Sequence, residues 1–148
     1  MTTTTPQKVG PFDIRPTVGA GVVILRAGAT GPEVLLIQRG KPPRQGEWSI
    51  PGGRQEPGET VREAAIREVQ EETALVVGDL RLIDVVDVVG GASGTQWVLV
   101  DFRADWTSGE AVAGGDAAAV QWVPLADLPR YGLWRETVRV IEAGAALR

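Results

Sequence analysis

Residues 53–75 read GRQEPGETVREAAIREVQEETAL and carry the strongest structural signal in the chain. Its second half, residues 60–73, contains no glycine or proline and is rich in alanine, glutamate and arginine, which predicts a helix. On a helical wheel, Glu68 and Glu72 fall on the same side as the apolar residues, one turn apart. A helix that faces solvent places its carboxylates on the opposite side. The pattern therefore predicts two glutamates that face the protein interior.

Two like charges at this spacing repel each other, and burial raises the free-energy cost, so a cation should lie beside them. Arg67 could pair with one carboxylate, but not with all four acidic residues of this region together. A hard divalent cation such as Mg²⁺, Mn²⁺ or Ca²⁺, which prefers oxygen ligands, is the other candidate. A solvated acidic helix, with Glu63 and Arg67 as a surface pair, is the alternative that the helix by itself leaves open. The four acidic residues are Glu59, Glu68, Glu71 and Glu72.

Length and composition limit the classes of function. The chain has 148 residues, a formal net charge of −4 and 43% hydrophobic residues, as expected of one globular domain. It contains no cysteine and no histidine, which excludes disulfides, thiol catalysis, Ser-His-Asp triads and metal sites built on imidazole or thiolate. The acidic balance argues against nucleic acid as a partner, and no apolar run reaches the roughly 18 residues of a membrane span. Because the threonine-rich start lacks an apolar signal-peptide core, we expect a cytoplasmic protein.

Around the helix, short segments rich in β-branched residues and bounded by glycine and proline predict an α+β sandwich. We interpret residues 1–14 as an N-terminal arm and residues 15–148 as a single domain, since no repeat or linker interrupts them. Gly52 and Gly53 predict a tight turn in which the backbone can approach a ligand. The expected strands are residues 17–26, 33–39, 48–50, 79–89, 96–104 and 118–123, and the expected second helix is residues 133–146.

The spacing within residues 53–75 resembles the signature of the Nudix family. The family pattern is Gly-x5-Glu-x7-Arg-Glu-U-x-Glu-Glu-x-Gly-U, in which U is a bulky aliphatic residue. Every position fits except Ala74, which stands where the pattern has glycine. The preceding residues 48–53, WSIPGG, are also similar to those that commonly precede the box. The resemblance implies a Nudix-type α/β/α sandwich with a mixed β-sheet, a catalytic helix after the Gly-Gly loop and a C-terminal helix.

The departure at Ala74 falls where the helix should end. Glycine at this position would adopt a left-handed conformation and close the helix, and alanine costs about 1 kcal/mol or more in that conformation. We therefore expect the helix to run slightly longer or to end by another route. The acidic positions are untouched, so the departure concerns the helix end more than a metal site.

The resemblance also implies a reaction, the metal-dependent hydrolysis of the pyrophosphate bond of a nucleoside diphosphate linked to another group. Such phosphoryl transfer depends on positioning and charge neutralisation. The sequence from Arg39 through the box is similar to short bacterial ADP-ribose pyrophosphatases, which implies conversion of ADP-ribose to AMP and ribose 5-phosphate. Other Nudix enzymes cleave nucleoside triphosphates, including oxidised ones, dinucleoside polyphosphates or NADH. A catalytically silent Nudix domain that senses a nucleotide is the alternative from another class.

Carried over residue by residue, the resemblance implies a site for Mg²⁺, with Mn²⁺ as a substitute. Glu68 and Glu72 are the main expected ligands, Glu71 binds through water or a second ion, and Glu59 is peripheral. The backbone of Gly52 and Gly53 would add a carbonyl. Arg67 would orient one of the glutamates. The full set of expected metal-binding residues is Gly53, Glu59, Glu68, Glu71 and Glu72.

The general base and the substrate contacts are less sharply defined. The base is a glutamate of the box, Glu71 or Glu72, or an acid of a later loop, Glu110 or Asp116. Arg39 and Arg44 could pair with a phosphate, and Trp48 is a candidate for substrate binding with core packing as its alternative. Trp97 and Phe102 have opposite parity on one strand, so one of them should face the core. The implied partner is a small nucleotide, and a homodimer is expected because members of this group often dimerise.

Overall fold

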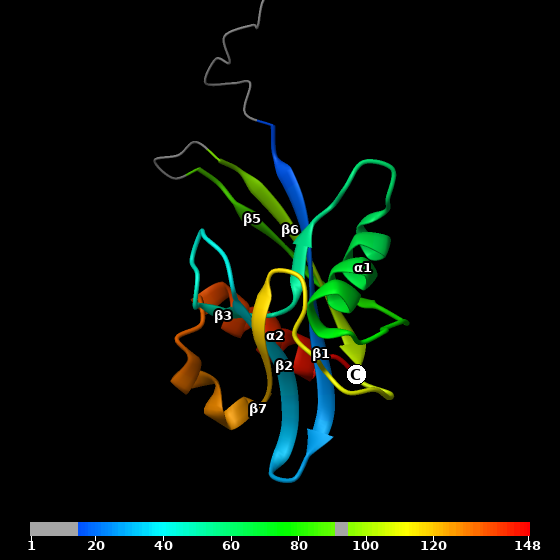
Figure 1. Ribbon diagram of the computed structural model, residues 1–148, viewed down its shortest axis with the longest axis vertical. Helices are drawn as coiled ribbons and strands as arrows, with labels where there is room; N and C mark the ends of the chain where they lie inside the picture. Colours follow the sequence, from blue (N-terminus) through cyan, green and yellow to red (C-terminus); the bar gives the residue numbers. More distant parts are fainter. Residues whose placement is uncertain (1–14, 91–94) are drawn as a thin grey trace, which may run out of the picture.

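The computed structural model describes residues 15–90 and 95–148, and within them seven strands form one mixed sheet (Figure 1). The strands are β1 (Thr17–Gly28), β2 (Gly31–Arg39), β3 (Trp48–Ser49), β4 (Gly52–Arg54), β5 (Arg81–Val88), β6 (Trp97–Asp105) and β7 (Ala117–Pro124). Their order is β3-β2-β1-β6-β5, while β4 pairs with β1 and β7 pairs with β2. β1 and β6 are parallel, and the other pairs are antiparallel.

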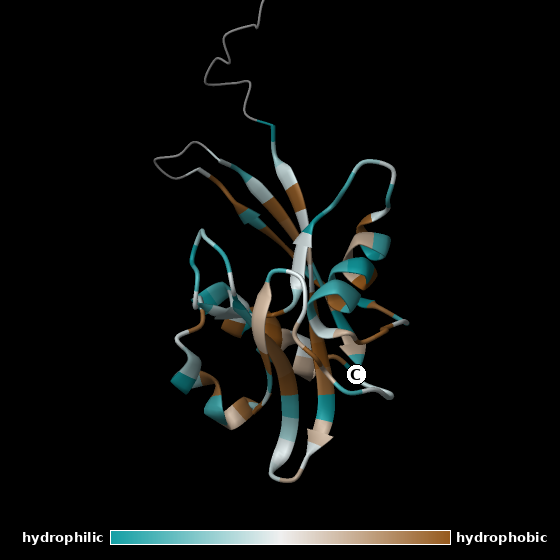
Figure 2. Ribbon diagram, viewed as in Figure 1, coloured by the Kyte–Doolittle hydropathy of each residue, from teal (hydrophilic) through white to brown (hydrophobic). Residues whose placement is uncertain are grey.

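The central strand β1 supplies side chains to both faces of the sheet because successive residues of a strand point to opposite sides. Val22 and Ile24 belong to one buried cluster, and Val23 belongs to the other. The helix α1 (Val61–Thr73) packs on the first face, and α2 (Arg135–Ala146) packs on the second. A short 3-10 helix, η1 (Leu125–Tyr131), precedes α2. Figure 2 shows hydrophobic residues along the middle of β1 and β2, and hydrophilic residues over much of α1.

The mixed α/β/α sandwich confirms the fold class that the sequence predicted. The predicted strands and helices are present, with ends that differ by one or two residues. Two elements were not predicted, β4 and η1. β4 forms because Gly52 pairs with Gly21 of β1, and a Cβ on Gly52 would overlap the backbone carbonyl oxygen of Ala20. Glycine therefore allows a strand where the sequence suggested only a turn.

The helix α1 begins and ends with defined caps. Thr60 accepts a hydrogen bond from the N–H of Glu63 at 3.1 Å, and the Glu63 carboxylate accepts one from the N–H of Thr60, which is a capping box. At the other end, Ala74 adopts a left-handed conformation with φ of 62°, and its N–H donates to the carbonyl of Gln70. The expectation that alanine would shift this end is therefore wrong. Alanine closes the helix where the family pattern has glycine.

The predicted arm, residues 1–14, lies outside the described residues. That residues 15–148 form a single domain stays a prediction, as does the homodimer. Among the residues that the structure describes, no helix is both long and apolar enough to cross a membrane.

Candidate active site

Arg67 of α1 is the centre of a partly buried charged cluster next to β4. Its guanidinium lies 2.7 Å from a carboxylate oxygen of Glu59, 2.9 Å from one of Glu68 and 3.3 Å from one of Glu71. It also donates to the backbone carbonyl of Arg54 at 3.0 Å. These contacts raise the pKa of Arg67 and lower that of Glu59. A fourth carboxylate, that of Glu56, lies 3.9 Å from the guanidinium. The sequence predicted a pairing with one carboxylate, whereas four share this guanidinium.

Glu72 is separate from this cluster. It is 5% exposed, and its carboxylate accepts a hydrogen bond from the backbone N–H of Gly52 at 2.9 Å. Burial raises the pKa of Glu72 to about 8, and the negative charge of Glu68 adds to the effect. Within residues 15–90 and 95–148, no arginine or lysine forms an ion pair with Glu72. The inward-facing glutamate predicted from the helical wheel is present, and among the described residues its carboxylate has the Gly52 N–H as a hydrogen-bond donor but no cationic side chain as an ion-pair partner.

Gly53 allows β4 to approach the carboxylates of α1. A Cβ at this position would lie 2.5 Å from the carboxyl carbon of Glu68 and 2.6 to 2.7 Å from its two oxygens. The pairing of Gly53 with Ala20 on β1 fixes the backbone of β4 in this place. The absence of a side chain at Gly53 is therefore what leaves room for the carboxylate of Glu68.

The donor chemistry of Glu68 and Glu72 fits a hard divalent cation that keeps part of its water shell. Burial raises the pKa of both carboxyl groups, and the negative charge of Glu68 contributes to the raised pKa of Glu72. Mg²⁺ is commonly held by one or two carboxylates together with waters and substrate phosphates. In the described part of the chain, no group of three or more acidic side chains is arranged to hold a metal ion. The residues thus fit a site with two carboxylates that a phosphate substrate completes.

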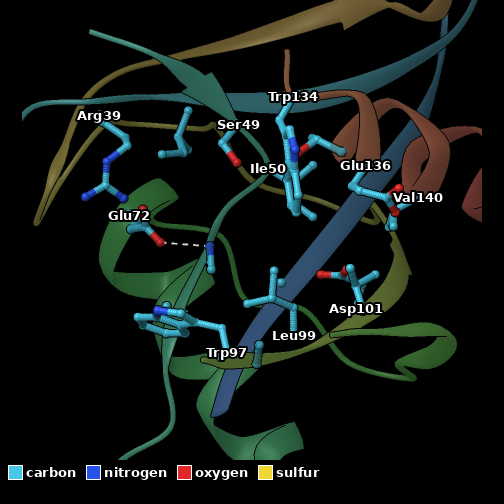
Figure 3. A pocket seen from close by; sticks show the side chains of 18 residues that line it. Arg39, Ser49, Ile50, Glu72, Trp97, Leu99, Asp101, Trp134, Glu136 and Val140 are labelled. Carbon is cyan, nitrogen blue, oxygen red and sulfur yellow. Dashed lines mark hydrogen bonds between the residues drawn. The ribbon is translucent and has the colours of Figure 1, made fainter. Parts of the chain in front are cut away.

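A pocket of about 240 Å³ opens beside Glu72, between the sheet and the start of α2 (Figure 3). Figure 3 shows Arg39 and Glu72 at one side of the pocket, and Asp101 and Glu136 at the other. Such a cavity, apolar along its walls and charged at its ends, suits a ligand with an anionic part and a flat apolar part. The walls carry Ile37, Ile50, Val86, Trp97, Leu99, Trp134 and Val140.

The three residues predicted to contact the substrate lie in different parts of the structure. Arg39 lines the pocket, and its Nε donates to the carbonyl of Pro43 at 2.8 Å. Arg44 lies in the exposed connection between β2 and β3, with φ of 62°. Trp48 packs edge-to-face on Tyr131, with ring centroids 5.3 Å apart, in the core on the α2 side. For Trp48 the structure thus shows the packing role that the sequence left as the alternative.

The loop acids predicted as general bases also lie apart from each other. Glu110 lines a different depression, next to Arg26. Asp116 is exposed and forms an ion pair with Lys41 at 3.0 Å. It is also close enough for its negative charge to contribute to the raised pKa of Glu72. Of the two loop acids, Asp116 is therefore the one near the carboxylates of α1.

Three residues that the sequence pattern did not single out for the site, Asp101, Trp134 and Glu136, also line the pocket. Asp101 had a local signal, because it is a lone acid inside the apolar run of residues 97–102, WVLVDF. The parity of that strand was informative as well, since Phe102 is buried in the core and Trp97 lines the pocket.

In a comparison with protein families, the family model described as NUDIX domain matches residues 15–143. The chain belongs to the Nudix family. An ADP-ribose pyrophosphatase from Methanocaldococcus jannaschii is 34% identical over 106 residues, which are 72% of this chain and 63% of that protein. The 8-oxo-dGDP phosphatase NUDT18 of Mus musculus is 35% identical over 117 residues, which are 76% of this chain and 35% of that protein.

Among solved structures, the Nudix chain resembles the crystal structure of a MutT NUDIX hydrolase from Burkholderia pseudomallei. The TM-score is 0.76 with 34% identity, and the match covers 87% of this chain and 98% of that one. The chain spans between about a third and two thirds of the length of the two curated relatives, 35% and 63%. The resemblance that residues 53–75 carry is thereby confirmed at the level of family and fold.

Proposed function

We propose that this Nudix protein hydrolyses the pyrophosphate bond of a nucleoside diphosphate linked to another group, with the help of a divalent cation. The observation that carries the proposal is Glu72, a buried carboxylate without an ion-pair partner among the described residues, beside Glu68 and at the edge of a pocket. Glu68, Glu72 and the backbone carbonyl of Gly53 would hold Mg²⁺ or Mn²⁺. The cation supplies charge neutralisation at the phosphates and a lowered pKa for water.

The other charged residues prepare this site. Arg67 contacts Glu68 and Glu71 and so restricts the orientation of both carboxylates. Arg39 lies in the same end of the pocket as Glu72, where a guanidinium can pair with a phosphate of the substrate. Glu71, Glu72 and Asp116 are the candidates for the base that accepts the proton of the attacking water. Glu110, in its separate depression, is the weaker candidate.

ADP-ribose is the proposed substrate, with AMP and ribose 5-phosphate as products. The similarity to the archaeal ADP-ribose pyrophosphatase supports this choice. The similarity to the mouse 8-oxo-dGDP phosphatase favours an oxidised purine nucleotide as the second candidate. Both are small nucleotides, and we propose no nucleic acid or membrane as a partner.

Hydrolysis of a substrate panel by the wild type and Glu72→Gln tests the proposal. With Mg²⁺ present, the panel contains ADP-ribose, NADH, a dinucleoside polyphosphate, 8-oxo-dGTP and 8-oxo-dGDP. We expect turnover of ADP-ribose by the wild type, and a loss of at least about a hundredfold in Glu72→Gln, because a ligand of the metal is removed. Glu63→Gln is the matched control, since Glu63 is exposed on the same helix and glutamine also completes a capping box.

Two results would contradict this proposal. If Glu72→Gln retained wild-type turnover, the buried carboxylate would have no part in the reaction. If no member of the panel were cleaved although Mg²⁺ and a nucleotide both bound, the domain would sense nucleotides instead of hydrolysing them.

A further inference from the structure

Asp101 on β6 is buried in the middle of the sheet and still faces the pocket (Figure 3). It is 7% exposed. In the described part of the chain, no hydrogen bond or ion pair involves its carboxylate, and no fully buried side-chain oxygen lacks a partner. The carboxylate oxygens of Asp101 must therefore open onto the pocket, where a ligand can reach them.

Arg139, whose positive charge acts on Asp101, forms its ion pairs with other acids. Arg139 of α2 lies 3.0 Å from a carboxylate oxygen of Asp84 and 2.8 Å from one of Glu136. It thus bridges two carboxylates and leaves that of Asp101 without an ion pair. Burial, together with the negative charge of Asp84, raises the pKa of Asp101 to about 6. The group is ionised at pH 7.5 and offers only hydrogen-bond acceptors.

Gly21 leaves the space that the carboxylate of Asp101 occupies. The two residues are register partners in the parallel pairing of β1 with β6. A Cβ on Gly21 would lie 2.5 Å from Oδ1 of Asp101 and 3.0 Å from Cδ1 of Ile50. A partnerless carboxylate in such a position costs free energy in the unliganded protein. Its presence points to a ligand that donates a hydrogen bond.

The surroundings of Asp101 indicate which part of a ligand would donate. Trp97 and Trp134 line the pocket together with aliphatic side chains, and indole rings are suited to contact a planar heterocycle. Arg39 and Glu72 lie at the other side of the same pocket, where the proposed function places the phosphates. A nucleotide bound in this direction would bring its base to Asp101.

We propose that Asp101 is a specificity-determining residue that accepts a hydrogen bond from an N–H group of the substrate's nucleobase. The pocket then selects bases with an amino group or a ring N–H on the edge that meets Asp101. This inference rests on the proposed function for the direction of the nucleotide, and it assigns the base end of the same site.

Binding without turnover tests the role of Asp101 directly. By isothermal titration calorimetry in the absence of metal, the full chain is titrated with AMP, GMP and the monophosphate of unsubstituted purine riboside, whose base has no N–H donor. We expect the wild type to bind AMP or GMP about tenfold or more tightly than the unsubstituted nucleotide, as a hydrogen bond to a charged group predicts. In Asp101→Asn we expect this preference to fall to about twofold, and in Asp101→Leu to vanish.

Asp87→Asn is the matched control, because Asp87 is an exposed aspartate on the neighbouring strand β5, and this variant should keep the wild-type preference. Thermal unfolding at pH 7.5 accompanies each titration, and Asp101→Asn should be at least as stable as the wild type because it removes a buried, unpaired charge.

Three results would overturn the inference. The first is a wild type that binds all three nucleotides equally, and the second is an unchanged preference in Asp101→Leu. The third is an equal loss of affinity for all three nucleotides in the Asp101 variants, which would place the carboxylate at the ribose. A failure of this inference can be told apart from a failure of the proposed hydrolysis. Hydrolysis with an unaltered base preference in the Asp101 variants would overturn this inference alone, whereas a lost preference would support it even if no substrate were cleaved.

Discussion

Gly52 and Gly53 are neighbours on β4, but a side chain added at each position would have a different effect. A Cβ on Gly52 would meet the backbone of Ala20, which cannot move without separating β4 from β1. A Cβ on Gly53 would meet the end of the Glu68 side chain, which is flexible. Gly52 is therefore required for the pairing of β4 with β1, whereas Gly53 is required for the position of the Glu68 carboxylate.

We predict that Gly53→Ala folds with nearly wild-type stability but loses about tenfold to a hundredfold in metal affinity, because the added methyl group displaces the carboxylate of Glu68. Calorimetric titration with Mg²⁺ or Mn²⁺ and a thermal unfolding curve measure the two effects separately. Gly78→Ala is the control, since a Cβ on Gly78 meets nothing within 4 Å. Unchanged metal binding by Gly53→Ala would contradict the placement of Glu68 in the metal site.

At the scale of elements, the helix α1 combines a well-formed start with a strained end. The capping box of Thr60 and Glu63 satisfies backbone N–H groups in its first turn. At its C-terminus, Ala74 is exposed and holds a left-handed φ of 62° that glycine adopts without strain. The position of the end is dictated by packing of the following chain, since Leu75 and Val77 are buried in the core on this face.

Replacement of Ala74 by glycine should therefore stabilise the protein by about 1 kcal/mol, because it removes the strain of the left-handed conformation. For a chain of this size we expect the midpoint of thermal unfolding to rise by about 2 to 4 °C. Ala143→Gly in α2 is the matched control, and it should lower stability by about 1 kcal/mol because residue 143 is helical. A decrease in stability for Ala74→Gly would show that the strain is absent.

At the scale of the whole molecule, β5, β6 and α2 meet at a group of charges around one pocket end. Asp101 on β6 faces Asp84 of β5 and the residues Glu136 and Arg139 of α2. Burial between these elements raises the pKa of Asp101 from 3.8 to about 6. Folding therefore makes this carboxyl group bind its proton more tightly, and the folded state is favoured by that group at low pH.

Stability against urea should consequently differ between the wild type and Asp101→Asn in a pH-dependent way. As the pH rises from about 4 to above 6, the wild type must ionise a buried acid and should lose up to about 3 kcal/mol relative to the variant. Comparing the two proteins at each pH removes the contribution of the other titrating groups. Parallel stability curves over this range would contradict a raised pKa for Asp101.

The sequence alone was sufficient for the family, the main helix and the inward-facing glutamate of the candidate site. These features depend on residues that are close along the chain, and the period of 3.6 residues per turn relates them directly. The predicted helix at residues 60–73 and the observed α1 differ by one residue, and Glu72 is buried as the helical wheel indicated. The spacing of residues along one helix was therefore enough to predict which carboxylates belong to the proposed metal site.

Three features depend on contacts between distant segments and became visible in the folded chain. They are the sharing of Arg67 among four carboxylates, the packing of Trp48 on Tyr131, and the set of residues at the far end of the pocket. Asp101, Trp134 and Glu136 come from β6, from the cap of α2 and from its first turn. Their proximity depends on the parallel pairing of β1 with β6 and on the packing of α2, which no local periodicity encodes. A pocket assembled from distant segments is set by long-range packing, and for that physical reason the sequence pattern could not reveal it.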